Sequence, residues 1–322
     1  GRDALLKKKL RPHQLKAVEA AVEHYRHHER GKMIMACGTG KTFTSLKIAE
    51  RLIAPRGTVL YLTPSISLLN QTLIEWTAQS ENPINAICVC SDNTAHKTND
   101  DVPVDNPILP STTEPDKIIE RLKPDAFNVI FSTYQSLDVV AQAQANSLRI
   151  TNYELRIDLI ICDEAHRTTG YVEKGADAPL FKRVHDQNFI RSKKRLYMTA
   201  TPKLYTTAVK KSAAEKDLFL WSMDDETIFG KDFYVLKFSD ALDQKLLTDY
   251  RVLVFTVREQ DVPDALKAQF NVSDVAKIYG AANALAKKLS DESRYILRDD
   301  PNPMRSAVAY CSSIKLSKTF AD

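Results

Sequence analysis

The 322-residue sequence contains no long run of uncharged apolar residues, since its longest such runs are only a few residues. We therefore expect no segment to cross a bilayer. Its five cysteines are odd in number and scattered, which disfavours a disulfide framework and favours reduced thiols in a cytosolic (cytoplasmic) protein. Neither sign of charge dominates, and a net charge of +4 permits a polyanionic partner without indicating one. The basic start, "GRDALLKKKL", lacks the apolar core and cleavage region of a signal peptide.

Strand-like apolar runs alternate with amphipathic helical stretches along the first 200 residues. Strands are expected at residues 32–36, 58–63, 84–90, 127–132, 157–162 and 195–200, and helices at residues 12–30, 43–53, 65–79 and 115–123. Near-continuous apolar strands separated by such helices predict an α/β fold in which helices cover both faces of a parallel sheet. Residues 91–114 are polar and proline-rich, which predicts a surface insertion.

The chain is too long for one comfortable core and suggests about two domains. After residue 245 the pattern restarts with a strand-like run at 251–257, a helical stretch around 274–289, a further strand at 306–311 and a helix start at 313. So few strands would leave exposed edges and little core. We therefore expect residues 246–322 to be the beginning of a second domain and the chain to be a piece of a longer protein.

The stretch "MACGTGKT", residues 35–42, lies between an expected strand and an expected helix. Backbone N–H groups of such a loop, with the positive end of the following helix, can face a phosphate. The sequence fits the end of G-x-x-x-x-G-K-[ST], although Met35 replaces the first glycine. The alternative is a glycine turn with an incidental lysine. We interpret the loop as nucleotide-binding, with candidate residues Cys37, Gly38, Thr39, Gly40, Lys41 and Thr42.

The stretch "LIICDEAHRTTG" places two acidic residues directly after an expected buried strand. Asp163 would lie at the carboxyl end of that strand, where ligands of open α/β sheets bind. Its carboxylate can hold Mg²⁺ together with the Thr42 hydroxyl and nucleotide phosphates. Glu164 is then free to orient and deprotonate an attacking water. The alternative is an ordinary polar surface loop.

Two other clusters are better explained as structural. His24, His27 and His28 have a spacing that a metal could use, but histidines in a last helical turn suit the negative end of the helix dipole. Cys88 and Cys90 alternate along an expected strand and read as small core residues.

The motifs together resemble those of superfamily 2 helicases and translocases. Residues 38–42, 163–166 and 199–202 are similar to motifs I, II and III, while "RPHQ", "LTPSISLLNQT", "FSTYQSL" and "AVAYC" resemble the upstream motif, Ia, Ib and the start of IV. The resemblance covers nearly the whole chain. The variants "MACGTGKT", "DEAHRTTG" and "RLYMTATPKLY" resemble the motor subunits of restriction-modification enzymes, in particular the single-polypeptide Type I (Type ISP) enzymes.

The resemblance implies a RecA-like ATP-binding domain over residues 1–245 and the beginning of a second RecA-like domain over residues 246–322. It implies ATP and Mg²⁺ as cofactors. The implied catalytic residues are Lys41 on the β- and γ-phosphates, Asp163 with Thr42 on Mg²⁺, Glu164 as the base, and His166. Gln14, with Arg11 beside it, would select adenine.

The resemblance also implies a path from nucleotide to DNA. His166, Thr199 and Thr201 would transmit the nucleotide state, and Pro64, Ser65 and Thr133 would contact a strand backbone. For His166 the alternative is a satisfied buried histidine, and for Ser65 it is helix capping.

The expected function is an ATP-driven translocase on double-stranded DNA within a restriction-modification enzyme. An arginine finger is expected beyond residue 322, and nuclease, methyltransferase and target-recognition domains are expected elsewhere in the full-length chain. Two alternatives stay open: an RNA helicase or duplex-RNA-dependent ATPase, because similar motifs occur there, and a nucleotide-gated clamp without turnover. Glu164 argues against the clamp, since a clamp needs no base.

Overall fold

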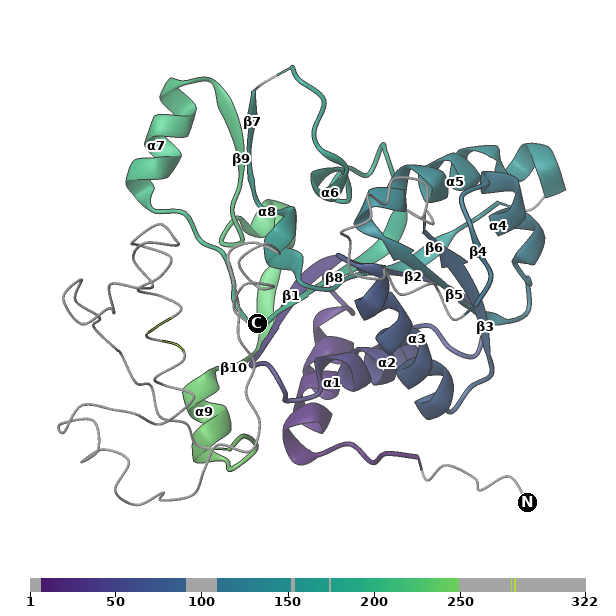
Figure 1. The fold of residues 1–322 in the computed structure, drawn as a ribbon, viewed down its shortest axis with the longest axis horizontal. Helices are drawn as coiled ribbons and strands as arrows, with labels where there is room; N and C mark the ends of the chain where they lie inside the picture. Colours follow the sequence, from purple (N-terminus) through teal and green to yellow (C-terminus); the bar gives the residue numbers. More distant parts are fainter. Residues whose placement is uncertain are drawn as a thin grey trace. The chain divides into compact units, whose positions relative to one another are not determined.

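The computed structural model describes residues 7–90, 109–151, 154–173 and 175–248, together with positions 279 and 281. The chain divides into two compact units, residues 1–248 and 249–322, and all elements below belong to the first unit (Figure 1). The strands and helices expected after residue 250, including the second RecA-like domain, lie outside the described residues. Residues 91–108 of the expected insertion also lie outside them.

An eight-stranded sheet forms the middle layer of the first unit. Its strands are β1 (Arg30–Met35), β2 (Gly57–Thr63), β3 (Ile84–Val89), β4 (Ser111–Thr112), β5 (Phe127–Thr133), β6 (Ile157–Cys162), β8 (Ser192–Thr199) and β10 (Lys231–Leu236). Their spatial order is β10-β1-β8-β6-β2-β5-β3-β4, and every pairing is parallel. Because the strands are parallel, their carboxyl ends meet at one edge of the sheet.

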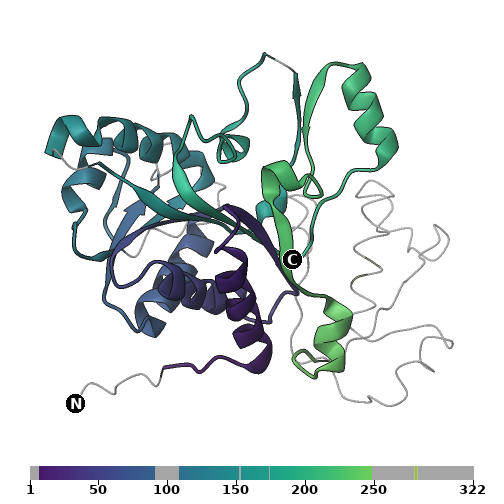
Figure 2. The same cartoon turned by 180° about the vertical axis from the view of Figure 1, so that it is seen from behind.

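Helices cover both faces of this sheet (Figures 1 and 2). One face carries α1 (Pro12–His24), α2 (Lys41–Leu52), α3 (Ile66–Gln79) and α9 (Phe238–Asp243). The other carries α4 (Pro115–Arg121), α5 (Leu137–Thr151), α6 (Leu180–Arg183) and α8 (Glu226–Phe229). The predicted α/β fold with a parallel sheet between two helical layers is confirmed.

The central strands are apolar on both sides because each side meets a helical layer. Along β2, Val59 and Tyr61 pack into the core beneath α1, α2 and α3, whereas Leu60 and Leu62 pack into the opposite core. All four side chains are fully buried. A strand buried on both faces shows no polar–apolar alternation, which explains the continuous apolar runs of the sequence.

The first helix ends earlier than predicted. We expected it to reach residue 30, but α1 ends at His24 and Gly31 lies within β1. The His24 ring folds over Gly31, and its Nε2 lies 2.8 Å from the carbonyl oxygen of Arg30. A Cβ at residue 31 would come within 2.5 Å of that ring, so this glycine permits a close helix–strand contact and does not end the helix.

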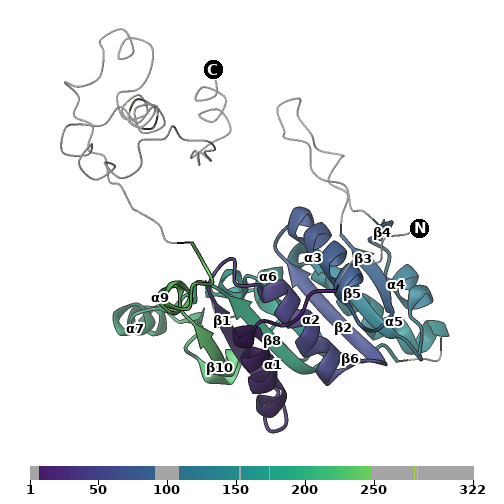
Figure 3. The same ribbon diagram turned by 90° about the horizontal axis from the view of Figure 1, so that it is seen from below.

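Several elements were not singled out in the sequence. They include α5, the edge strand β10 and a two-stranded antiparallel ribbon. β7 (Gly170–Glu173) and β9 (Leu218–Trp221) form this ribbon, and α7 (Thr207–Glu215) lies between them in the sequence. Figure 3 shows β10 and β4 at opposite ends of the sheet. These strands are short or half-exposed, so their apolar pattern is weak. Within the described ranges, no helix combines the length and apolarity needed to cross a membrane.

Candidate nucleotide site

The candidate residues follow strands that are neighbours in the sheet. The glycine loop follows β1, the residues after Thr199 follow β8, and the acidic pair follows β6, in the spatial order β1-β8-β6. On the other side of β6 lies β2, followed by β5; these two strands lead to Ser65 and to the short helix η2 (Tyr134–Ser136). The parallel sheet thus brings segments more than 100 residues apart to one edge.

The glycine loop has a backbone conformation that favours glycine at two positions. Gly38 and Gly40 have φ values of 78° and 87°, in the left-handed region that side chains disfavour. Between them Thr39 is buried, and its hydroxyl donates to the carbonyl of Ala36 at 2.7 Å. Met35, which stands where the motif has its first glycine, is fully buried in the core beneath α1 and α2 and leaves the loop clear. The substitution is therefore compatible with a phosphate-binding loop.

Lys41 is half-buried at the first position of α2. Its Nζ lies 3.4 Å from the carbonyl oxygen of Met35, so the side chain folds back across the loop that it follows. This long contact is weak, and the ammonium is free to exchange it for an anion. Thr42 is also half-buried, in the first turn of the same helix.

Gln14 is held against the loop from α1. Its Nε2 donates to the carbonyl of Thr39 at 3.2 Å, and its Oε1 accepts from the backbone N–H of Arg11 at 2.9 Å. A primary amide has two N–H groups and two oxygen lone pairs, so one of each remains for an adenine edge. Arg11 is exposed beside it.

His13 is a loop contact that sequence reasoning missed. It is buried, and its Nε2 lies 2.9 Å from the carbonyl oxygen of Thr39. Since a carbonyl only accepts, Nε2 must carry the hydrogen. Nδ1 is then an acceptor, and it has no hydrogen-bond partner among the described residues. The His-Gln pair therefore places two donors on one loop carbonyl.

Asp163 is nearly fully buried where β6 ends. Its Oδ1 accepts from the backbone N–H of Glu164 at 3.0 Å. Burial and the neighbouring Glu164 carboxylate raise the pKa of Asp163 to about 6, although that N–H and the Lys41 ammonium oppose the rise. The negative charge of an ionised Asp163 carboxylate is only partly balanced by its neighbours, and a bound cation would balance the rest.

The residues present fit a magnesium–nucleotide complex. Mg²⁺ prefers hard oxygen ligands, usually one or two from the protein with phosphates and waters completing the shell. The Asp163 carboxylate and the Thr42 hydroxyl are such ligands, and the buried carboxylate lacks a full counter-charge. The N–H groups of the adjacent glycine loop would bind the phosphates.

Glu164 and His166 connect the acidic pair to β8. Glu164 has φ 48° and ψ 46°, a left-handed conformation that costs a non-glycine residue about 1–3 kcal/mol. Its Oε2 lies 3.3 Å from Nδ1 of His166, which lies 2.9 Å from Oγ1 of Thr199. Oγ1 of Thr199 also accepts from the backbone N–H of Thr201 at 3.1 Å. Partial burial lowers the pKa of His166, although the Glu164 carboxylate opposes this shift.

The predicted DNA-contact residues divide into exposed and buried ones. Ser65 is exposed and caps α3 by accepting from the N–H of Leu68 at 3.4 Å. Pro64 is buried, and so is Thr133, whose hydroxyl bonds to Ser136 at 3.2 Å. In this conformation neither Pro64 nor Thr133 presents its side chain to a nucleic-acid strand. Gln135, which was not among the predicted residues, is exposed beside them.

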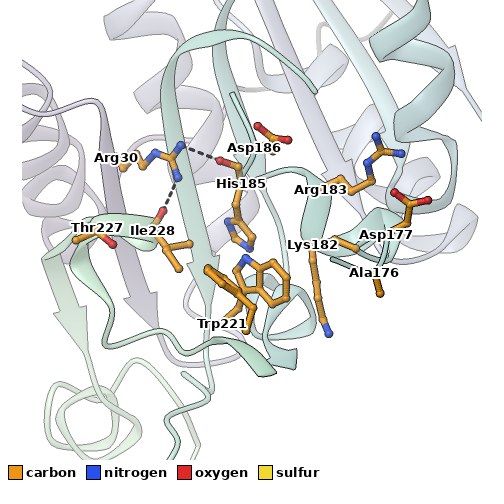
Figure 4. A pocket seen from close by; sticks show the side chains of 12 residues that line it. Arg30, Ala176, Asp177, Lys182, Arg183, His185, Asp186, Trp221, Thr227 and Ile228 are labelled. Atoms are coloured by element: carbon orange, nitrogen blue, oxygen red, sulfur yellow. Dashed lines mark hydrogen bonds between the residues drawn. The ribbon is translucent and has the colours of Figure 1, made fainter. Parts of the chain in front are cut away.

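A cavity of about 510 Å³ lies elsewhere in the first unit, and none of the predicted residues lines it (Figure 4). It lies by α6, the ribbon strand β9 and the start of β1. Several of its polar groups are engaged within the protein: Arg30 donates to the carbonyls of His185 and Ile228, and Lys182 donates to that of Tyr171. His185 is also bonded at both ring nitrogens. The cavity presents mixed charge around Trp221 and does not define one ligand chemistry.

The histidine cluster at the end of α1 and the two cysteines near the end of β3 were interpreted as structural. His24 stacks on His28 with ring centroids 4.5 Å apart. Within the described ranges, no group of three or more His, Cys, Asp or Glu side chains is arranged to hold a metal ion. Cys88 and Cys90 are buried, and burial raises the pKa of the Cys88 thiol to about 12.

A glycine loop after β1, an acidic pair after β6 and a contact from that pair to β8 define a helicase-like ATPase domain of RecA-like fold. Residues 7–204 match the family described as "Type III restriction enzyme, res subunit". This span is more than half of the chain, and the chain belongs to that family.

Two solved structures extend the likeness beyond this span. The ATP-dependent Type ISP restriction-modification enzyme LlaBIII bound to DNA is 37% identical, with a TM-score of 0.68 over 87% of this chain and 19% of that chain. A nuclease-deletion mutant of the Type ISP enzyme LlaGI in complex with a DNA substrate mimic is 34% identical, with a TM-score of 0.56 over 90% of this chain and 23% of that chain. The predicted likeness to Type ISP enzymes is confirmed.

A curated relative comes from a virus. The probable helicase A859L of African swine fever virus is 30% identical over 212 residues, which are 65% of this chain and 21% of the viral protein. The chain thus spans only about a fifth of the length of each of these proteins.

Proposed function

We propose that this chain is the ATP-binding part of a motor that couples ATP hydrolysis to movement along double-stranded DNA within a restriction-modification enzyme. The observation that carries the proposal is the Glu164–His166–Thr199 contact beside a phosphate loop. A nucleotide clamp needs the loop alone, whereas a motor needs a base and a link from that base to the rest of the domain.

The residues have distinct roles in this proposal. Thr42 and Asp163 would hold Mg²⁺, which when bound neutralises charge on the phosphates. Lys41 would leave the Met35 carbonyl for a phosphate oxygen, and the loop N–H groups would bind the others. Glu164 would accept a proton from the attacking water, and His166, through Thr199 and Thr201, would sense its state. Gln14 and Arg11 would contact adenine.

The proposed partner is double-stranded DNA. Support comes from the two similar Type ISP enzymes, whose structures hold DNA or a DNA mimic, and from the exposed Ser65 and Gln135 at the carboxyl ends of β2 and β5. Nuclease, methyltransferase and target-recognition domains are proposed for the full-length protein, and the similar LlaGI structure is that of a mutant from which a nuclease was deleted. We place the activity in the cytoplasm, in keeping with the free thiols of Cys37, Cys88 and Cys162.

The test uses the full-length protein and its Glu164→Gln variant. Duplex DNA should stimulate ATP hydrolysis and support triplex displacement, and Glu164→Gln should lose about 10²- to 10⁴-fold in turnover while still binding Mg-ATP, because an amide cannot take the proton of water. Glu173→Gln, which changes an exposed carboxylate on β7, is the matched control.

Two outcomes would favour the alternatives. Stimulation by duplex RNA but not by duplex DNA would indicate an RNA-dependent ATPase. Tight Mg-ATP binding without turnover in the unaltered protein would indicate a clamp. Near-normal turnover of Glu164→Gln would remove the base assignment.

A further inference from the structure

Two buried aromatic side chains donate hydrogen bonds to the backbone of the two proposed Mg²⁺ ligands. The first is Trp76 on α3. Its side chain is fully buried, and its indole Nε1–H donates to the carbonyl oxygen of Thr42 at 3.1 Å. The same oxygen accepts from the Ser45 hydroxyl at 2.8 Å. A contact from another helix thereby fixes the first turn of α2.

The second is Tyr134, the first residue of η2. It is fully buried, and its hydroxyl donates to the carbonyl oxygen of Asp163 at 2.8 Å. Its ring stacks on Phe181 of α6 with centroids 4.8 Å apart. Asp163 is also anchored through its own N–H, which donates to the carbonyl of Leu62 on β2 at 2.9 Å. The backbone that carries the carboxylate is therefore attached to β2 and to the residue that follows β5.

Both donors are connected to the segments that carry the exposed candidate contacts. The Trp76 ring meets Tyr61 of β2 and Phe131 of β5 edge-on, with centroids 5.1 and 5.9 Å apart. Tyr61 and Phe131 are paired across the two strands, two residues before the paired ends of these strands. Beyond those ends lie Ser65, which starts the helix of Trp76, and Gln135, which directly follows Tyr134.

We propose that Trp76 and Tyr134 are positioning residues that couple nucleic acid at the carboxyl ends of β2 and β5 to the backbone of Thr42 and Asp163. This inference rests on the proposed function. A shift of α3 or η2 on DNA binding would move an indole N–H or a phenol O–H that holds a Mg²⁺ ligand in place. The reverse also holds, because coupling between two binding sites is reciprocal.

Packing alone does not explain these donors. Phenylalanine would fill either position with a ring, but only tryptophan and tyrosine supply a polar hydrogen to a buried carbonyl. The variants Trp76→Phe and Tyr134→Phe therefore remove the hydrogen bond and keep an aromatic ring. Two matched controls exist. Tyr25→Phe removes a buried hydroxyl that donates to the carbonyl of Arg195 at 2.7 Å, away from α3 and η2. Trp221→Phe replaces the other tryptophan among the described residues.

The experiment measures, in the full-length protein, the dissociation constant of duplex DNA with and without a non-hydrolysable ATP analogue and Mg²⁺. The ratio of the two constants is the coupling factor, typically about 5- to 150-fold where sites are coupled. Trp76→Phe and Tyr134→Phe should each reduce that factor about 2- to 10-fold, the effect of one hydrogen bond. Tyr25→Phe and Trp221→Phe should leave it unchanged.

The outcomes separate this inference from the proposed function. A factor of one in the unaltered protein would overturn both. A factor well above one that both variants retain would overturn the positioning role and leave the motor intact. A melting scan of each variant checks folding, and if Trp76→Phe melts too low to assay, Tyr134→Phe, which removes a single oxygen atom, decides the question.

Discussion

At the scale of single residues, the acidic pair after β6 combines two unfavourable features. Asp163 is buried beside another carboxylate with only partial compensation from Lys41, and Glu164 holds a left-handed backbone. A bound cation would offset the first of these features. Strain of this kind persists only where the surrounding structure enforces it, and here the hydrogen bonds from Tyr134 and to Leu62 do so.

Replacing Asp163 by asparagine should stabilise the chain when Mg²⁺ is absent. The pKa of Asp163 rises from 3.8 to about 6 on folding, so its ionised form opposes folding. The cost is absent below pH 3.8, grows between pH 3.8 and 6, and is complete above that, where it amounts to about 3 kcal/mol. The amide oxygen of an asparagine side chain can still accept from the N–H of Glu164.

Urea unfolding between pH 4 and 8 measures this difference. Asp163→Asn should gain stability over the unaltered chain as the pH rises towards 7, and Mg²⁺ with ATP should stabilise only the unaltered chain. Equal stability of the two proteins at every pH would contradict the assigned burial cost.

The individual residues were predictable from sequence to different degrees. The order of motifs indicated Lys41, Thr42 and the acidic pair, because each belongs to a local pattern of backbone and side chain. His13 and Tyr134 were not indicated, since their contacts join residues 26 and 29 positions apart in the chain. Thr133 was predicted to contact a nucleic-acid strand; it is buried, and its hydroxyl donates to Ser136, a contact that depends on the course of η2.

At the scale of elements, two glycines perform separate tasks. Gly40 has φ 87°, and a Cβ there would lie 2.3 Å from Nε2 of Gln14, so alanine would disturb both the loop and the α1 contact. Gly31 has ordinary strand geometry, and a Cβ there would meet the rings of His24 and Phe233, which pack α1 against β1 and β10. Gly40 thus shapes the proposed phosphate loop, whereas Gly31 permits close packing of α1 on the sheet.

Alanine substitutions at these glycines should therefore separate binding from stability. Gly31→Ala should lower the free energy of unfolding by about 1–3 kcal/mol through overpacking, with little change in nucleotide affinity. Gly40→Ala should weaken ATP binding about 10-fold or more, since it displaces loop N–H groups and Gln14. Thermal melting and a fluorescent-nucleotide titration measure the two quantities. A weakened nucleotide affinity in Gly31→Ala would show that the two contacts are not separate.

The elements of the central sheet were the most predictable part of the fold. β2, β5 and β6 are buried on both faces, so their sequences are continuously apolar and bounded by polar segments. The ribbon of β7 and β9 was not found because each strand has only four residues, and all of these except Trp221 are exposed or half-buried. β10 closes the sheet beside β1, but its outer residues remain exposed and weaken the apolar signal.

At the scale of the whole molecule, the described residues form an eight-stranded parallel sheet that carries the proposed ATP-binding residues, and the chain spans about a fifth of the length of the enzymes that it resembles. We propose that stepping requires a second RecA-like domain that closes on the nucleotide and supplies an arginine finger. Removing such an arginine typically costs about 10³-fold or more in rate.

Residues 1–322 alone should therefore bind Mg-ATP but show little DNA-stimulated hydrolysis and no translocation. Their DNA binding should be weak, independent of sequence and steeply reduced by salt, because the net charge is only +4 and the contacts are to phosphates. ATPase rates and triplex displacement, measured for these residues and for the full-length enzyme, test this expectation. The full-length enzyme should restore stimulated turnover through the second domain. Robust DNA-stimulated hydrolysis by residues 1–322 alone would contradict a two-domain mechanism, because it would require all transition-state groups to lie within this chain.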